Sequence, residues 1–378
     1  MQPGRRVLRF LSRLRRVRFD HSSEALPVVL QFGRMVAAYI GGGFTPLECY
    51  LYHFLCRNVS RRGYVSTSWI ERQFRPALNR PNQTILLKNK LQFYRFYKGH
   101  NLPVPEVLAV MEPDSPQFSS TTSQPPIIRT AEELRQLLAE TGVATVVAKP
   151  LASLGGKGTM LLKRIGPDQL LDLGREEPIT IEGFYRRMMA DITTRQVRED
   201  SATGYLLQEQ VVCHPSLNPL KGKALNTVRI ATLRDPSGTV HFDFAMLRIA
   251  KPTSVTDNLH KGGVVAGIEP LEGKISNITY GYETDEGPYI ERKSQDLSAL
   301  FPEGKVPRWH DLLNLAITAH SFLPGVNSVG WDIALSTHGP VLIEGNDNWD
   351  MVIAQVIDGP YLTPERKEIL AGYGLTAL

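Results

Sequence analysis

The segment at residues 330–350, GWDIALSTHGPVLIEGNDNWD, places acidic and amide side chains between apolar ones. Two short apolar runs flank a turn over residues 336–340, which predicts a β-hairpin. With that turn, Asp332 lies directly across from Glu344, and Asn346 follows on the same face. Facing carboxylates repel each other, and oxygen ligands of this kind suit a hard divalent cation such as Mg²⁺. A solvated hairpin whose acids pair with lysine or arginine fits the pattern equally well.

A second segment, VVAKPLASLGGKGTMLL, joins Lys149 to a glycine-containing loop. Its pattern predicts strand, loop and strand, and the backbone N–H groups of such a loop can bind phosphate oxygens. It is not a Walker A loop, because Gly158 follows Lys157 where that loop has Ser or Thr. Glycine-containing hairpins also occur without a ligand, so the segment alone does not establish a nucleotide site.

Two arginines lie on a predicted long hairpin formed by ALNTVRIATLR and TVHFDFAMLRIA. With a four-residue turn at 235–238, Arg229 opposes Phe244, and Arg248 shares its face roughly 13 Å further along the ladder. Two arginines on an apolar strand face are unfavourable unless an anion meets them. An extended substrate with phosphate and carboxylate groups could do so, and pairing with Glu209 or another acid is the alternative.

The elements that must position these residues change in type along the chain. The first hundred residues predict helices, one ending at Gly41–Gly43, one capped by Thr45 with Glu48 three residues later, and one over about 86–99. From about residue 144 short strands predominate, with helices near 179–198 and 309–321. Helices and mostly antiparallel strands that do not alternate regularly indicate an α+β fold with lobes around a cleft.

The composition is that of a globular protein. The chain has 378 residues, of which 42% are hydrophobic and 21% charged, enough for two or three lobes. No apolar run approaches the ~18 residues of a membrane span. The three cysteines have neither a disulfide framework nor a zinc-binding spacing, which favours a reducing cytoplasm. Cys49 and Cys56 are seven residues apart and would share one face of a helix, where packing is the simpler role.

The first eighteen residues, MQPGRRVLRFLSRLRRVR, contain seven arginines and no acid. Their apolar residues recur at helical spacing, so the segment is predicted to form a basic amphipathic helix. Such a helix can lie on an anionic membrane surface, dock on a partner, or simply cover the domain. Nucleic acid is not an expected partner, because no binding motif accompanies the charge.

Taken in order, these motifs resemble the ATP-grasp superfamily. Lys90 precedes LPVP, Lys149 precedes the glycine loop, and then follow QEQVV, VRI, LRIA, DNLHKGG, WDIAL and IEGN. The later half is similar to the RimK-type glutamate ligases. More closely, NTVRIATLRD, DNLHKGGVVAGI and GWDIALSTHGPVLIEGN resemble the sugar-transfer-associated ATP-grasp proteins. The resemblance extends over about residues 85–350, and Asn89 departs from it, because many members have Asp before the lysine.

The resemblance implies an ATP-grasp fold, two α+β lobes clasping ATP, with a helical N-terminal region. It implies that Lys90 and Lys149 contact the phosphates of ATP. The other residues implied by position are a phosphate-capping loop of Ser153, Gly155, Gly156, Lys157 and Gly158, an adenine-binding hinge of Glu209, Gln210 and Val211, a Mg²⁺ (or Mn²⁺) site of Asp332, Glu344 and Asn346, and the phosphoryl-stabilising Arg229, Arg248 and Asn258.

The activity implied is an ATP- and Mg²⁺-dependent carboxylate–amine ligase that works through an acyl phosphate and releases ADP and phosphate. An amino acid, sugar acid or peptide-like metabolite is the expected substrate class, and the sequence does not name its members. A small-molecule kinase on the same fold and a nucleotide-binding accessory protein of a polysaccharide machinery are the alternatives. We expect the protein in the cytoplasm. Two contacts stay open for residues 1–18, one with the inner face of the membrane and the other with a glycan machinery. We expect four divisions of the chain. They are the basic amphipathic helix at 1–20, a helical N-terminal region at 21–105, an ATP-grasp lobe with the glycine loop at 106–208, and an ATP-grasp lobe with the metal-binding hairpin at 209–378.

Overall fold

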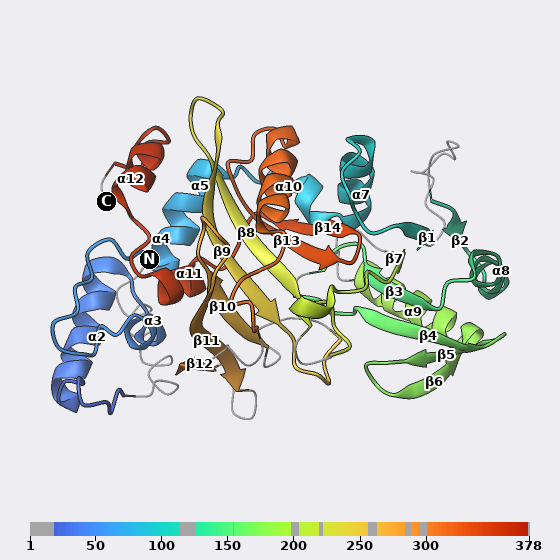
Figure 1. Ribbon diagram of the computed structural model, residues 1–378, viewed down its shortest axis with the longest axis horizontal. Helices are drawn as coiled ribbons and strands as arrows, with labels where there is room; N and C mark the ends of the chain where they lie inside the picture. The colour runs from blue at the N-terminus through green and yellow to red at the C-terminus, as the bar shows by residue number, and fades with distance from the viewer. Residues whose placement is uncertain are drawn as a thin grey trace.

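A computed structural model of the chain describes residues 19–112, 125–153, 155–197, 204–218, 222–255, 263–283, 289–294 and 301–376. The predicted basic helix at residues 1–18 and the predicted site residue Asn258 lie outside these ranges. Figure 1 shows two sheets side by side, with helices above and around them. The mixed helices and strands give the α+β class that the sequence predicts.

The first sheet, at the right of Figure 1, carries the glycine loop. Apart from one parallel pair between β1 and β2, its strands are antiparallel. In spatial order the strands are β2 (Ile127–Ile128), β1 (Val107–Met111), β7 (Tyr205–Glu209), β3 (Thr145–Pro150), β4 (Met160–Gly166), β5 (Gln169–Asp172) and β6 (Glu177–Thr180).

The second sheet carries the acidic hairpin and both arginines. All its strand pairs are antiparallel. Its spatial order is β12 (Tyr289–Ser294), β11 (Ile275–Glu283), β10 (Val264–Ile268), β9 (Val240–Ile249), β8 (Thr227–Arg234), β13 (Ser328–Ser336) and β14 (Gly339–Asn346). The acidic hairpin therefore forms one edge of this sheet.

The helices fall into groups that cover particular sheet faces. On the second sheet, α10 packs against one face, and the N-terminal helices with α11 share a core with the other. On the first sheet, α8 and α9 share the core of one face. The helices are α2 (Val28–Gly42), α3 (Pro46–Leu51), α4 (Thr67–Trp69), the π-helical η1 (Ile70–Phe74), α5 (Arg75–Leu78), α6 (Ile85–Lys88), α7 (Lys90–Gly99), α8 (Ala131–Thr141), α9 (Ile181–Val197), the short 3₁₀ turn η2 (Pro215–Leu217), α10 (Trp309–Phe322), α11 (Met351–Asp358) and α12 (Pro364–Ala371).

Helix α7 connects the two sheets. Leu91 and Tyr94 pack with buried residues of β1 and β7 in the first sheet. Tyr97, on another face of the helix, packs edge-on against Trp331 of the second sheet, with ring centroids 5.9 Å apart. The side chain of Asn89 caps the helix by accepting the backbone N–H groups of Leu91 and Gln92. The first residue of α7, Lys90, is thereby held where the two sheets meet.

The predicted N-terminus of α3 is confirmed. Thr45 and Glu48 form a reciprocal capping box, with proline at the first helical position. The helix ends at Leu51, however, and His53 has a left-handed backbone with φ of 56°. The prediction that Cys49 and Cys56 share one helix face is therefore wrong, because Cys56 lies beyond the turn that ends the helix.

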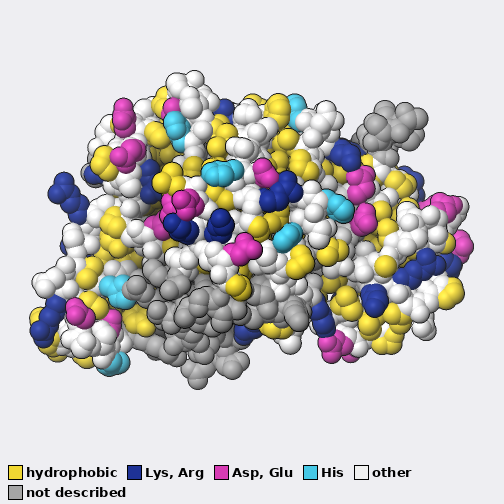
Figure 2. Space-filling model, in the orientation of Figure 1, with side chains coloured by type: hydrophobic (Ala, Val, Ile, Leu, Met, Phe, Trp, Pro, Cys, Tyr) yellow, Lys and Arg dark blue, Asp and Glu magenta, His cyan; other side chains and the backbone are white. Residues whose placement is uncertain are grey.

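Charge is evenly mixed on the surface that Figure 2 displays. Basic and acidic side chains are interspersed there rather than gathered by sign. None of the described helices is both long and apolar enough to cross a membrane.

Candidate nucleotide and metal site

The acidic hairpin brings two carboxylates face to face. Asp332 of β13 pairs with Glu344 of β14, so the predicted pairing is confirmed. The predicted turn over residues 336–340 is wrong, because Ser336 already pairs with Gly339. A bulge between Asp332 and Ile333 shifts the register by one residue and restores the predicted pair.

Two arginines converge on Asp332 from neighbouring strands. Arg229 of β8 donates from Nε to Oδ1 at 2.7 Å and from Nη2 to Oδ2 at 2.8 Å. Arg248 of β9 donates from Nη1 to Oδ2 at 2.7 Å. The exposed fraction is 4% for the Asp332 side chain and 12% for each arginine. This is a buried ion triad in which one carboxylate orients two guanidinium groups.

The predicted separation of these arginines along the ladder is wrong. Arg229 opposes Met246 instead of Phe244, and Arg248 opposes Thr227. A bulge between Ala231 and Thr232 and a longer turn change the register. The two arginines therefore lie two pairs apart on the ladder and reach the same carboxylate. The acid that pairs with both is Asp332, and Glu209 is exposed at the end of β7.

The two facing carboxyls have opposite pKa shifts. Burial by itself would raise the pKa of Asp332, but the charges of Arg229 and Arg248 outweigh it and hold that pKa well below its usual range. Burial and the negative charge of Asp332 raise the pKa of Glu344, and the charges of Lys90 and Lys149 only partly oppose that rise. The negative charge of Glu344 is thus the one that this cluster leaves less compensated.

Lys90 lies between the hairpin and the glycine loop. Its ammonium group donates to the backbone oxygen of Ser153 at 3.0 Å, and its backbone N–H donates to the backbone oxygen of Leu151 at 3.0 Å. Burial lowers the pKa of Lys90, and the charge of Glu344 acts against that shift. The structure therefore brings together Lys90, Lys149 and Ser153 from around the first sheet and Glu344 from the second.

The amide of Asn346 completes the polar edge of the hairpin. Its Nδ2 lies 3.5 Å from Glu344 Oε1 and 3.5 Å from the backbone oxygen of Gly330. The three predicted metal ligands are therefore adjacent in the hairpin. Each of them offers at least one side-chain oxygen atom to a metal ion.

The glycine loop has a backbone that other residues adopt with difficulty. Gly155, Gly156 and Gly158 have φ values of 62°, 65° and 79°. A Cβ atom on Gly158 would lie 2.8 Å from Pro150 Cγ and 3.1 Å from Nη2 of Arg195. Lys157 of the same loop is exposed. The loop thus packs closely on the end of β3, next to an arginine.

Arg195 is a residue of this region that sequence reasoning missed. It lies on α9, where its Nε donates to Asp191 at 2.5 Å, and the hydroxyl of Tyr205 donates to the same oxygen at 2.6 Å. Its charge also contributes to the lowered pKa of Lys90. An Asp and Arg four residues apart are ordinary on an exposed helix, so the sequence gives no signal for this position.

The predicted adenine hinge is the segment that crosses from one sheet to the other. Glu209 ends β7, where its backbone N–H donates to Glu106 at 3.0 Å. Gln210 and Val211 follow, both half-buried. The backbone N–H of His214 then donates to Leu335 of β13 at 2.7 Å. Residues 209–214 therefore connect the two sheets directly.

Residues 70–371 match the family described as sugar-transfer associated ATP-grasp. The chain belongs to this family. This family match confirms the ATP-grasp resemblance that the sequence predicts, and with it the ATP-grasp fold. No curated protein matches the sequence of this ATP-grasp protein.

Three solved structures illustrate how distant its structural relatives are. An RimK domain ATP-grasp protein from Sphaerobacter thermophilus is 13% identical, with a TM-score of 0.36, and the match covers 75% of this chain and 69% of that one. Biotin carboxylase from Campylobacter jejuni is 12% identical, with a TM-score of 0.43 and coverage of 78% and 47%. The D-alanine-D-alanine ligase from Coxiella burnetii is 11% identical, with a TM-score of 0.34 and coverage of 70% and 48%. This chain thus spans about half the length of the last two.

Proposed function

We propose that this ATP-grasp protein is an ATP- and Mg²⁺-dependent ligase that joins a carboxylate to an amine and releases ADP and phosphate. The observation that carries the proposal is the meeting of the Asp332–Glu344 pair, with its two arginines, and the lysines Lys90 and Lys149. A dense cluster of both signs at the junction of two sheets suits a substrate that carries phosphates and a metal ion.

The hairpin fits a Mg²⁺ ion in its donor atoms and in its charge. Asp332, Glu344 and Asn346 offer oxygen donors, which Mg²⁺ prefers, and the carboxyl of Glu344 has a raised pKa that a cation would relieve. Asp332 is already bound by two guanidinium groups, so Glu344 is the ligand with the less compensated charge. Mn²⁺ has the same donor preference. When bound, the ion would neutralise phosphate charge and orient the phosphates.

The nucleotide would lie between the glycine loop and the hairpin. Lys90 and Lys149 would contact its phosphates, and the loop residues Ser153, Gly155, Gly156, Lys157 and Gly158 would cover them with backbone N–H groups. The backbone of Glu209, Gln210 and Val211 would meet the adenine at the segment that joins the sheets. This arrangement supports a division at residues 106–208 and 209–378, one lobe carrying the loop and the other the hairpin.

Arg229 and Arg248 would stabilise the transferring phosphoryl group. Each guanidinium has five N–H donors, and Asp332 accepts two from Arg229 and one from Arg248. Asp332 would therefore also be a positioning residue for both arginines. Asn258, which lies outside the described residues, would act beside them.

The chemistry requires no nucleophile from the protein. A carboxylate oxygen of the substrate would attack the γ-phosphorus of ATP, the bond to ADP would break, and an acyl phosphate would form. An amine would then attack the acyl carbon and displace phosphate, losing a proton to solvent. The protein residues would hold the reactants together and stabilise the charge on the phosphoryl group.

The proposal is tested by supplying ATP and Mg²⁺ with a panel of amino acids, uronic acids and amines. We expect one substrate pair to give an amide, identified by mass spectrometry, with ADP and phosphate in equal amounts. ADP together with a phosphorylated product would establish the kinase instead. ATP binding without turnover on any pair would support the accessory role. Glu140→Gln, an exposed change on α8, is the control for Glu344→Gln, which should lose turnover.

A cytoplasmic location follows from the proposed substrate, ATP. Peripheral contact with an anionic membrane surface through residues 1–18 is part of the same proposal, because that segment holds seven arginines and no acid.

A further inference from the structure

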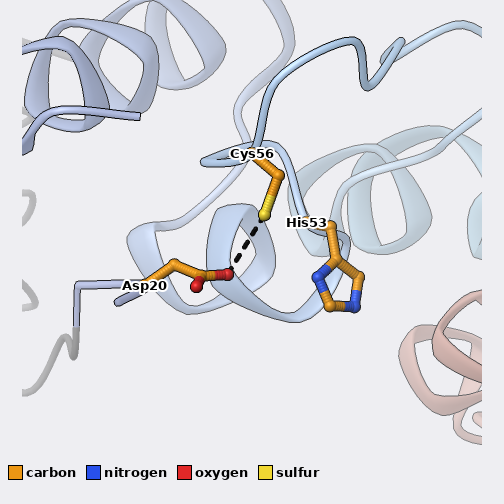
Figure 3. Close-up of side chains that lie close together, drawn as sticks. All are labelled: Asp20, His53 and Cys56. Atoms are coloured by element: carbon orange, nitrogen blue, oxygen red, sulfur yellow. Dashed lines mark hydrogen bonds between the residues drawn. The ribbon is translucent and has the colours of Figure 1, made fainter. Parts of the chain in front are cut away.

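A cluster of three potential metal ligands lies in the N-terminal region. Asp20, His53 and Cys56 each offer one ligand atom, and these atoms lie within 4.8 Å of one another. Figure 3 shows the sulfur of Cys56 directed at the carboxylate of Asp20, with the ring of His53 beside both. In Figure 1 this region, near α2 and α3, lies at the left end of the molecule, on the far side of the second sheet from the first sheet and its glycine loop. The proposed ligase chemistry therefore makes no use of these residues.

The turn that carries His53 and Cys56 is fixed by contacts from other segments. Arg34 donates from Nη1 to the backbone oxygens of Phe54 at 3.1 Å and Cys56 at 2.7 Å. The backbone N–H of Cys56 donates to His53 at 3.0 Å, and that of Leu26 donates to Leu55 at 3.0 Å. The left-handed backbone of His53 is thus held in place, and its side chain and that of Cys56 are oriented in advance of any ligand.

Asp20 is held as firmly from the other side of the cluster. The amide of Gln31, which is 1% exposed, accepts the backbone N–H of Asp20 at 3.0 Å and donates to its backbone oxygen at 2.7 Å. The backbone N–H of Ser22 donates to Oδ1 at 2.8 Å. The other oxygen, Oδ2, accepts from the sulfur of Cys56 at 3.2 Å. One carboxylate oxygen is therefore fixed by the surrounding protein, and the other is directed into the cluster, a pattern typical of metal ligands.

The three ligand types select the class of metal. Thiolate, imidazole and carboxylate together suit Zn²⁺ and related transition metals, whereas Mg²⁺ and Ca²⁺ prefer oxygen alone. Zinc ligands at about 2.0 Å for oxygen and about 2.3 Å for sulfur lie about 3.5 Å from each other in a tetrahedral site. The observed 3.2 Å between Cys56 Sγ and Asp20 Oδ2 is close to that separation. A thiolate and a carboxylate would also balance the two charges of the ion.

We propose that Asp20, His53 and Cys56 form a Zn²⁺ site that fastens the chain at residue 20 to the turn after α3. When the ion binds, the proton of the Cys56 thiol leaves to solvent and its sulfur bonds the metal. Three protein ligands leave a fourth position for a water molecule. Because this site and the nucleotide site share no residue, its failure would leave the ligase proposal unaffected.

The test uses the full-length protein, stripped of metal with a chelator and titrated with Zn²⁺ by calorimetry and with Co²⁺ by absorption spectroscopy. We expect one ion per chain and, with Co²⁺, a thiolate-to-metal charge-transfer band. Asp20→Asn, His53→Asn and Cys56→Ser should each weaken binding at least tenfold, and Cys56→Ser should abolish the band. Asparagine at position 53 tolerates the left-handed backbone, so that variant removes the imidazole with little strain.

Cys213→Ser is the matched control, because Cys213 is a thiol outside the cluster, and it should bind Zn²⁺ as the unchanged protein does. Circular dichroism establishes that each variant is folded. If Cys56→Ser does not fold, Asp20→Asn is the deciding variant. Asp20 is only half-buried, and asparagine at this position keeps an acceptor for the backbone N–H of Ser22. No binding by the unchanged protein, or equal binding by the folded cluster variants, would overturn the proposal.

Discussion

Replacing Asp332 by asparagine should destabilise the protein far more than replacing Glu344 by glutamine, although the two carboxylates face each other in one hairpin. Asp332 compensates two largely buried guanidinium groups, and its own side chain is 4% exposed. Removing one charge from a buried ion pair costs about 3–5 kcal/mol, since the partner charge is left buried. Asparagine keeps one acceptor oxygen, so we expect about 3 kcal/mol, at the lower end of that range.

Glu344 has the opposite environment. Its pKa is raised, because burial and the charge of Asp332 disfavour its ionised form. Glutamine removes a charge that the fold does not stabilise, so the free energy of unfolding should change by less than about 1 kcal/mol. Both variants should nevertheless lose Mg²⁺-dependent turnover, because both remove a proposed metal ligand.

Urea unfolding followed by tryptophan fluorescence measures this difference, since Trp331 is fully buried and precedes Asp332 in the chain. Asp311→Asn is the matched control. It breaks a pair with Arg308 in which the exposed fractions are 50% and 48%, and an exposed pair of this kind contributes at most about 1 kcal/mol. A loss for Asp332→Asn that is no larger than the loss for Asp311→Asn or Glu344→Gln would refute the argument.

Three further outcomes are expected. Gly158→Ala should weaken ATP binding measured by calorimetry, because its Cβ would clash with Pro150. Gly142→Ala is the control: Gly142 has φ of 64° with open space around it, so this variant should lose only about 1 kcal/mol in the free energy of unfolding, from backbone strain. Burial lowers the pKa of His320 from 6.5 to about 4, so its unfolded form binds a proton first as the pH falls. Between about pH 8 and about pH 5, the free energy of unfolding of the unchanged protein should therefore fall by about 2 kcal/mol more than that of His320→Gln. Denaturant titrations measure both, and an equal fall would contradict this expectation. Deleting residues 1–18 should reduce sedimentation with anionic liposomes and leave ATP affinity unchanged, and unchanged sedimentation would return that segment to a covering role.

Local signals in the sequence predicted local structure well. The capping box of Thr45 and Glu48 fixes the start of α3, and the strand on either side of the glycine loop is where alternation and glycine spacing predict it. The predicted pair of Asp332 and Glu344 is also present, but there the bulge between Asp332 and Ile333 offsets an error in the predicted turn. These features depend on residues that are near each other in the chain.

Register beyond a bulge could not be predicted, because a single extra residue leaves no mark in the pattern of apolar and polar positions. The bulge between Ala231 and Thr232 changes the partners of Arg229 and brings that residue and Arg248 to one carboxylate. The strand that supplies this carboxylate, β13, lies about a hundred residues later in the sequence. The cost of burying arginine indicated that an anion must be present, and it did not indicate which one.

The proposed zinc site shows the same limit more clearly. His53 and Cys56 are close in sequence, but Asp20 reaches them only because a buried amide, that of Gln31, holds its backbone. A search for metal-binding spacing cannot find a ligand that tertiary contacts supply.

The most direct test of the ligase proposal follows oxygen atoms. The carboxylate substrate identified in the panel is labelled with oxygen-18 in its carboxyl group, and the released phosphate is analysed by mass spectrometry. An acyl phosphate pathway predicts one labelled oxygen in each phosphate, because the carboxylate oxygen that attacks ATP leaves with the phosphoryl group. Unlabelled phosphate, with all of the label retained in the product, would contradict the proposed mechanism.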